Sequence, residues 1–297
     1  MLAILPYALA ALLYGVLALH FWRTRWRDQT PRAPGIERWE RAAVIVPFAL
    51  HSWLVYHGLY SAPELRFGFS QALSVTLWLA VLIYWFESLF VNLEGMQALV
   101  LPLAAVSVLL SGLFPGLESP AYVNRFEFRA HLTLAMLAYS LFTIGALHAL
   151  LMALVEGHLH HDRMFGALRD SIAPHSERMG PRSGLLAGPL SSLPPLLTLE
   201  RLLFRILGLG FVLLTLTLAT GVIFSEDLFG KALRFNHKTL FAILSWIIFG
   251  LLLGGRYYYG WRGRKALRWT LAGFIALLLA YVGSRFVLEV VLGRSLA

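Results

Sequence analysis

Four histidines are the residues of this chain best suited to bind a metal: His51, His57, His131 and His237. Imidazole is a common ligand of transition metals and of haem iron, and two opposed imidazoles hold haem without a covalent bond. His51 lies ~14 Å along an apolar stretch, whereas the other three lie near the ends of such stretches. If the stretches cross a membrane, His51 is near the middle and the others share one surface. The spacing predicts a haem or metal site in that half of the membrane.

Two alternatives remain open for these histidines. An interfacial histidine is often only amphipathic, and one in mid-membrane can simply hydrogen-bond a neighbouring helix. His51 and His57 lie about 120° apart around a helix, so they do not both face one small site. Arginines on the same side could pair with haem propionates, and nearby aromatic residues could flank the ring. The arginines are Arg66, Arg125, Arg129 and Arg234; the aromatic residues are Trp53, Tyr56, Tyr60, Phe126, Phe128, Tyr139 and Phe235.

The chain contains no cysteine. This excludes a thiol relay, covalently attached haem, an iron–sulfur cluster and a thiolate metal site. Any metal chemistry must therefore rest on His, Met or carboxylate side chains.

The elements that must position the histidines are long apolar helices. Hydrophobic residues make up 58% of the chain and charged residues 14%, about half the charge of a typical soluble domain. About 20 continuous apolar residues cross a bilayer as helix, and continuous runs exclude barrel strands. We predict an all-α, polytopic transmembrane bundle of about eight spans. The spans are Leu2–Phe21, Ala42–Tyr60, Phe69–Phe86, Gly95–Phe114, His131–Val155, Leu202–Phe224, Thr239–Gly255 and Trp269–Leu292.

The basic residues predict how the bundle is oriented. Most Lys and Arg residues fall in alternate gaps, which places those gaps inside and both termini outside. The first apolar stretch is expected to be a retained span, because arginines rather than a cleavage pattern follow it. The net charge of +9 is spread over short loops, where anionic membrane lipid explains it. We therefore expect lipid contact and no nucleic-acid partner.

One long gap divides the chain into three parts. Residues 1–155 form a five-span part, residues 156–201 a Pro- and Gly-rich cytoplasmic linker that is partly disordered, and residues 202–297 a three-span part. The linker begins with His158, His160 and His161, which we interpret as a solvated loop, or alternatively as a weak metal site. Arg285 and Glu289 lie one turn apart and are expected to pair.

The segment Leu213–Arg285 carries a family resemblance. It contains Leu-Leu-Thr-Leu-Thr-Leu-Ala-Thr-Gly, then Gly-Trp-Arg-Gly-Arg-Lys at 260–265, and then Ala-Tyr-Val-Gly-Ser-Arg at 280–285. It resembles the bacterial inner-membrane cytochrome c assembly family, closest to its short HemX-like or YpjD-like branch. The span plan extends the resemblance to nearly the whole chain. The family carries or presents haem, which implies haem as a non-covalent cofactor and cytochrome c maturation components as partners.

The resemblance carries over to two histidines and fails at two other features. His51 matches the family's intramembrane histidine, and His131 matches its outer histidine before a span. The larger members have a Trp- and Asp-rich outer loop, but the loop 225–238 has no tryptophan and contains His237 instead. They also have a second outer histidine after the following span, where this chain ends.

Together these features predict a protein of the bacterial inner membrane that binds or handles haem during cytochrome c assembly or haem regulation. His131 and His51 are the predicted axial ligands, with His237 and His57 as further cofactor-binding candidates. No nucleophile–base set is present, so we expect no enzyme activity. The alternatives are a haem-free membrane scaffold or a transporter of a small solute or metal. A shared aromatic pocket would favour haem binding, unrelated packing the scaffold, and a polar mid-membrane cavity the transporter.

Overall fold

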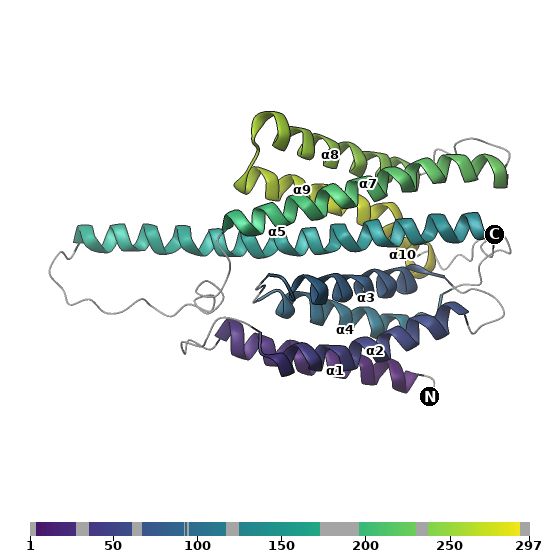
Figure 1. Cartoon of the computed structure of the whole chain (residues 1–297), viewed down its shortest axis with the longest axis horizontal. Helices are drawn as coiled ribbons and strands as arrows, with labels where there is room; N and C mark the ends of the chain where they lie inside the picture. Colours follow the sequence, from purple (N-terminus) through teal and green to yellow (C-terminus); the bar gives the residue numbers. More distant parts are fainter. Residues whose placement is uncertain are drawn as a thin grey trace.

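The computed structural model of the protein describes residues 4–27, 36–60, 67–91, 93, 95–116, 125–172, 196–229 and 237–291, and every regular element within these ranges is helical. The predicted all-α class is therefore confirmed. The helices run nearly parallel to one another along the long axis of the molecule (Figure 1).

The N-terminal half is a group of four helices. They are α1 (Leu5–Phe21), which continues into a π-helical turn η2 (Trp22–Arg27), α2 (Arg38–Tyr60), α3 (Phe69–Glu87) and α4 (Gln97–Leu113). Helix α1 packs against α2 and α4, and α3 packs against α2 and α4. Pro47 and Pro102 lie inside α2 and α4, where neighbouring helices of a membrane bundle compensate for the missing N–H.

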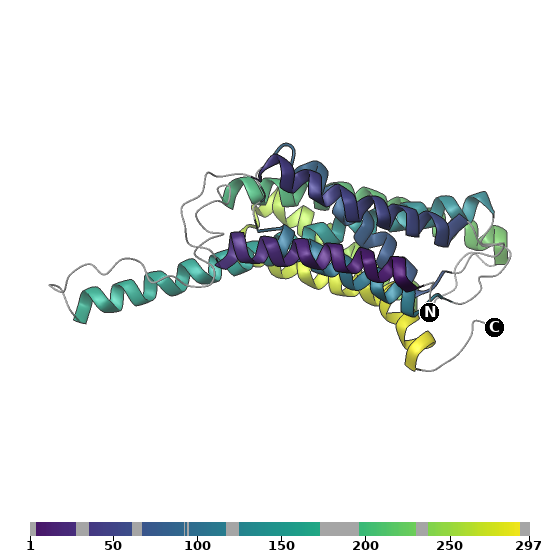
Figure 2. The same cartoon turned by 90° about the horizontal axis from the view of Figure 1, so that it is seen from below.

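Helix α5 (Phe126–Ile172) is the centre of the bundle. It contacts α3 on one side and α7 and α9 on the other, as Figure 1 shows. Its 47 residues correspond to ~70 Å, more than twice the ~30 Å hydrocarbon layer. The C-terminal part of α5 accordingly projects beyond the other helices in both views (Figures 1 and 2).

The C-terminal half lies across α5 from the N-terminal half. It contains α7 (Leu196–Phe229), α8 (His237–Tyr259) and a last span made of α9 (Gly263–Leu278), η4 (Leu279–Gly283), α10 (Ser284–Phe286) and η5 (Val287–Val291). Gly260 and Gly263 have φ values of +64° and +56°, which only glycine adopts readily. They form the sharp turn between α8 and α9.

Six helices are long and apolar enough to cross a membrane among the described residues, and α4 is a shorter apolar helix. Helix α2, which carries the polar residues His51, Ser52 and His57, falls outside both groups. Helix α1 begins at the same end of the bundle at which the last span ends (Figure 1). The eight-span count and the outer location of the termini remain predictions. We call this end the predicted outer end, and the opposite end the predicted inner end.

Helices enter both ends of the predicted linker 156–201. Helix α5 continues to Ile172 and α7 begins at Leu196, and the division of the chain at 156 and 201 stays a prediction. Helix α5 can extend this far because the first proline after Glu156 is Pro174, so nothing in between stops a helix. Residues 173–195, and the side chains of His158, His160 and His161, lie outside the described parts of the chain.

Candidate functional site

His51 is fully buried at the centre of the N-terminal half. Its Nε2 lies 2.9 Å from Ser74 Oγ on α3, and its ring meets the Tyr14 ring of α1 edge-on at 5.8 Å. His51 Nδ1 has no hydrogen-bond partner among the described residues. Polar side chains deep in a membrane helix are costly, and an unpartnered one points to a functional or packing role.

His131 lies on the opposite side of α3, where α5 meets α7. Its Nδ1 is 3.0 Å from Thr220 Oγ1, and a Cβ added at Gly221 would lie 3.3 Å from its Cε1. Glycine at this position therefore makes room for the ring. With Nδ1 held by Thr220, Nε2 is the nitrogen that remains to bind a ligand, an arrangement that fixes many metal-binding histidines.

His57 and His237 are both exposed. His57 stacks at an angle on Trp53, with ring centroids 5.1 Å apart, and it lines a cavity between α1, α2, α3 and α4. His237 is the first residue of α8, whose start lies at the predicted outer end, as does the start of α5 (Figure 1).

The structure does not bring the two predicted axial ligands together. His51 contacts α1 and α3, whereas His131 contacts α7. No group of three or more His, Cys, Asp or Glu residues is placed to hold a metal ion in the described ranges. The predicted aromatic pocket shared by His51 and His131 is thus absent from the contacts that these side chains make.

Side-chain hydrogen bonds at the predicted outer end, which we call the latch, join helices α3 and α4 of the N-terminal half. Gln71 Oε1 accepts a hydrogen bond from the Gly68 N–H at 3.0 Å, and Gln71 Nε2 donates to the Phe114 carbonyl at 2.9 Å. Ser70 Oγ donates to the same carbonyl. The start of α3 is thereby tied to the end of α4.

Gly116 allows this latch to form. Its φ is +78°, and a Cβ there would lie 2.7 Å from Gln71 Oε1. We expect Gly116→Ala to destabilise the protein by about 1–3 kcal/mol, because it adds left-handed strain to a steric clash. Thermal unfolding in detergent measures the effect, with Gly58→Ala as the control, since a Cβ at Gly58 meets nothing within 4 Å. Equal unfolding temperatures for the two variants would contradict the assigned latch.

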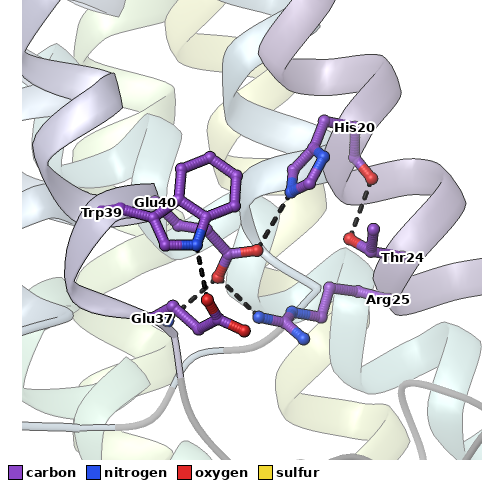
Figure 3. Close-up of polar contacts among 6 residues, drawn as sticks. All are labelled: His20, Thr24, Arg25, Glu37, Trp39 and Glu40. Atoms are coloured by element: carbon purple, nitrogen blue, oxygen red, sulfur yellow. Dashed lines mark hydrogen bonds and ion pairs between the residues drawn. The ribbon is translucent and has the colours of Figure 1, made fainter.

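A buried ion-pair cluster, which the sequence analysis missed, joins η2 to the start of α2 (Figure 3). The Glu40 carboxylate accepts hydrogen bonds from Arg25 at 2.6 Å and from the Glu37 N–H at 3.0 Å, and its Oε1 lies 3.0 Å from His20 Nε2. Arg25 and Glu40 expose only 5% and 3% of their side chains. The signal in the sequence was a pair of glutamates, Glu37 and Glu40, at the end of an arginine-rich gap.

His148 and Glu87 meet in the interior between α5 and α3. His148 Nδ1 lies 2.9 Å from the Ile144 carbonyl oxygen, and its Nε2 lies 3.8 Å from Glu87 Oε2. Glu87 exposes only 11% of its side chain. The predicted Arg285–Glu289 pair involves a Glu289 side chain outside the described residues.

Comparisons with known proteins agree with this architecture. Residues 39–292 match the family model described as "Cytochrome C assembly protein". The chain is 33% identical to "Inner membrane protein YpjD" of Escherichia coli (strain K12) over 161 residues, 54% of this chain and 52% of that protein. It is 34% identical to "Cytochrome c biogenesis protein CcsA" of Rippkaea orientalis over 86 residues, 29% of this chain and 25% of that protein.

The matches span about half of the first relative and a quarter of the second, and no solved structure matches the chain. The similarity to an inner-membrane protein, together with the six apolar helices, identifies a multi-pass protein of the bacterial inner membrane. The predicted location is confirmed.

Proposed function

Because the chain belongs to the cytochrome c assembly family, we propose that it binds haem non-covalently in the membrane and handles it during cytochrome c assembly or haem regulation. The observation that carries this proposal is the geometry of His131. Its Nδ1 is held by Thr220 at the seam of α5 and α7, which orients Nε2 for an iron atom. The proposed role is binding, with no catalytic step.

His131 fits a haem ligand better than His51 does. The ring of His131 is only half buried, so a ligand can reach it, and Gly221 lets the ring pack closely against α7. His51 is fully enclosed, and its Nε2 is already used by Ser74. We therefore assign His131 as the axial ligand and His51 as a residue that organises the N-terminal half.

The residues around His131 suit the remainder of haem. Bound haem supplies the iron, while the chain supplies the imidazole, an apolar surround and charge for the propionates. Arg125, directly before α5, and Arg129, within it, lie between His131 and the predicted outer end, where guanidinium groups can pair with the propionate carboxylates. His237, exposed at the start of α8, is the proposed second ligand. Lipid surrounds the bundle, and cytochrome c maturation components are the proposed partners.

Titration of the purified protein with haemin, followed by visible spectroscopy, tests the assignment. We expect a shifted Soret band that His131→Ala abolishes and His237→Ala alters, because a lost axial ligand changes the field at the iron. His57→Ala is the matched control and should leave the band unchanged. A band that persists unaltered in His131→Ala would overturn the assignment.

Thr220→Val gives a finer test of the same site. Valine keeps the size of the threonine but removes the hydroxyl that holds His131 Nδ1. We expect haem affinity to fall by about 10–100-fold, as for other residues that orient a metal ligand. Thr215→Val on the same helix is the control. Thr215 lies away from His131, and its Oγ1 accepts a hydrogen bond from Trp246 Nε1. Equal affinities in the two variants would contradict the role of Thr220.

A haem-free scaffold or assembly subunit is the second candidate. It is favoured by the separation of His51 and His131 into different helix contacts. A folded protein with a flat spectrum after haemin addition would support this candidate instead.

A further inference from the structure

A cavity lies away from His131, in the N-terminal half at the predicted outer end. The cavity has a volume of ≈ 180 Å³ and opens between α1, α2, α3 and α4. Its polar lining residues come from each of these helices. They are Tyr7, His57, Gln71, Ser74 and Ser111, and the apolar lining residues are Leu54, Val55, Val75 and Pro115.

Some of these polar groups already form hydrogen bonds within the protein and others do not. Gln71 holds the latch and Ser74 bonds His51. By contrast, Tyr7, His57 and Ser111 make no side-chain hydrogen bond within the described part of the chain. A small-molecule site usually has apolar walls and a few polar groups that are available to hydrogen-bond the ligand. This cavity has three such groups.

The walls of the cavity are rigid. A Cβ at Gly112 would lie 2.8 Å from Tyr7 Cγ, so the tyrosine ring rests directly on the backbone of α4. The latch between Gln71 and Phe114 holds the opposite wall. A site formed before its ligand arrives loses little entropy on binding.

Size and charge limit what can bind. A cavity of about 150 Å³ admits one benzene ring, so ≈ 180 Å³ accommodates a single substituted ring and excludes the four-pyrrole macrocycle of haem. The lining that the structure describes includes no Lys, Arg, Asp or Glu, which disfavours an ion. Hydroxyl, phenol and imidazole groups can each donate or accept a hydrogen bond.

We propose that this cavity binds a neutral single-ring molecule carrying hydroxyl or carbonyl groups, with Tyr7, His57 and Ser111 as its hydrogen-bond partners. The assignment gives His57 a role apart from haem. It is independent of the proposed haem site, because His131 lies across α3 from the cavity.

Because the chain contains no cysteine, a maleimide labels only a cysteine that is introduced by substitution. We expect Ser111→Cys to react with a maleimide in the purified full chain. Ser107→Cys, one turn away on α4 and fully buried, should stay unreactive. p-Cresol at ten times its Kd should slow the labelling of Ser111→Cys about tenfold, and leave the exposed Thr133→Cys on α5 unaffected.

Two results would overturn the proposal. Ser111→Cys that is as inert as Ser107→Cys, in a protein with unchanged helicity, would mean that the cavity is closed. If p-cresol does not change the labelling rate of Ser111→Cys, the cavity holds only water. 4-Octylphenol distinguishes the source of the ligand. Protection by both phenols indicates an opening toward lipid, and protection by p-cresol alone indicates entry from water. His131→Ala should leave the protection unchanged, so failure of the haem proposal is separable from failure here.

Discussion

Glu40→Ala is expected to destabilise the protein by about 3–5 kcal/mol. The substitution removes the carboxylate that the buried Arg25 contacts at 2.6 Å, and breaking a buried ion pair by removing one partner costs this much. It also removes the acceptor of the Glu37 N–H. The loss should appear as a lower unfolding temperature in detergent and as a lower denaturant midpoint.

A matched surface pair provides the control. Arg125 and Glu127 are 3.9 Å apart, with about half of each side chain exposed. Exposed pairs contribute little, so Glu127→Ala should change the free energy of unfolding by less than about 0.5 kcal/mol. The double variant Arg25→Met/Glu40→Leu should recover most of the lost stability, because it removes both charges together. A double variant no more stable than Glu40→Ala would contradict the ion-pair explanation.

The cluster also bears on function through the position of α2. Glu40 lies near the start of the same helix that carries His51 and His57. By fixing that start against η2, the Glu40–Arg25 pair sets the register of α2 in the N-terminal half. Loss of the pair should therefore loosen the phenol-sized cavity as well as the fold.

The helices could be predicted closely from the sequence because long apolar runs leave few alternatives. The predicted stretch Phe69–Phe86 is α3 within one residue, and the family was recognised from its motifs. The end of α5 was missed because His158 and its neighbours are polar. Polar residues end a membrane span but do not end a helix.

The arrangement of the helices could not be predicted in the same way. A helix that is apolar on all sides gives no indication of which face meets which neighbour. The partner of His51 is 23 positions away and that of His131 is 89 positions away, and both are ordinary Ser or Thr residues. Arg25 was interpreted only as a marker of the inner side, since the positive-inside rule counts charges without pairing them.

Phe249→Ala is the other substitution with a large expected effect, and it tests how the C-terminal half is attached to α5. The rings of Phe142 on α5 and Phe249 on α8 are stacked, with centroids 3.9 Å apart, and both are fully buried. Glycine backbones enclose the stack. A Cβ at Gly210 would lie 3.2 Å from Phe142, and one at Gly273 would lie 2.9 Å from Phe249. Four helices therefore meet at this one pair of rings.

Removing the Phe249 ring leaves a cavity that α9 cannot fill, because Gly273 contributes no side chain. We expect a loss of about 3–5 kcal/mol, and a smaller one for Phe249→Leu, which retains much of the volume. Phe126→Ala, at a residue that is 81% exposed, is the control and should have little effect. Packing, rather than the hydrophobic effect, holds helices together within lipid. The ring stack must therefore supply much of the packing between α5, α8 and α9. If Phe249→Ala unfolds at the wild-type temperature, the C-terminal half is attached to α5 elsewhere, and the seam of α5 and α7 that carries His131 is the main attachment.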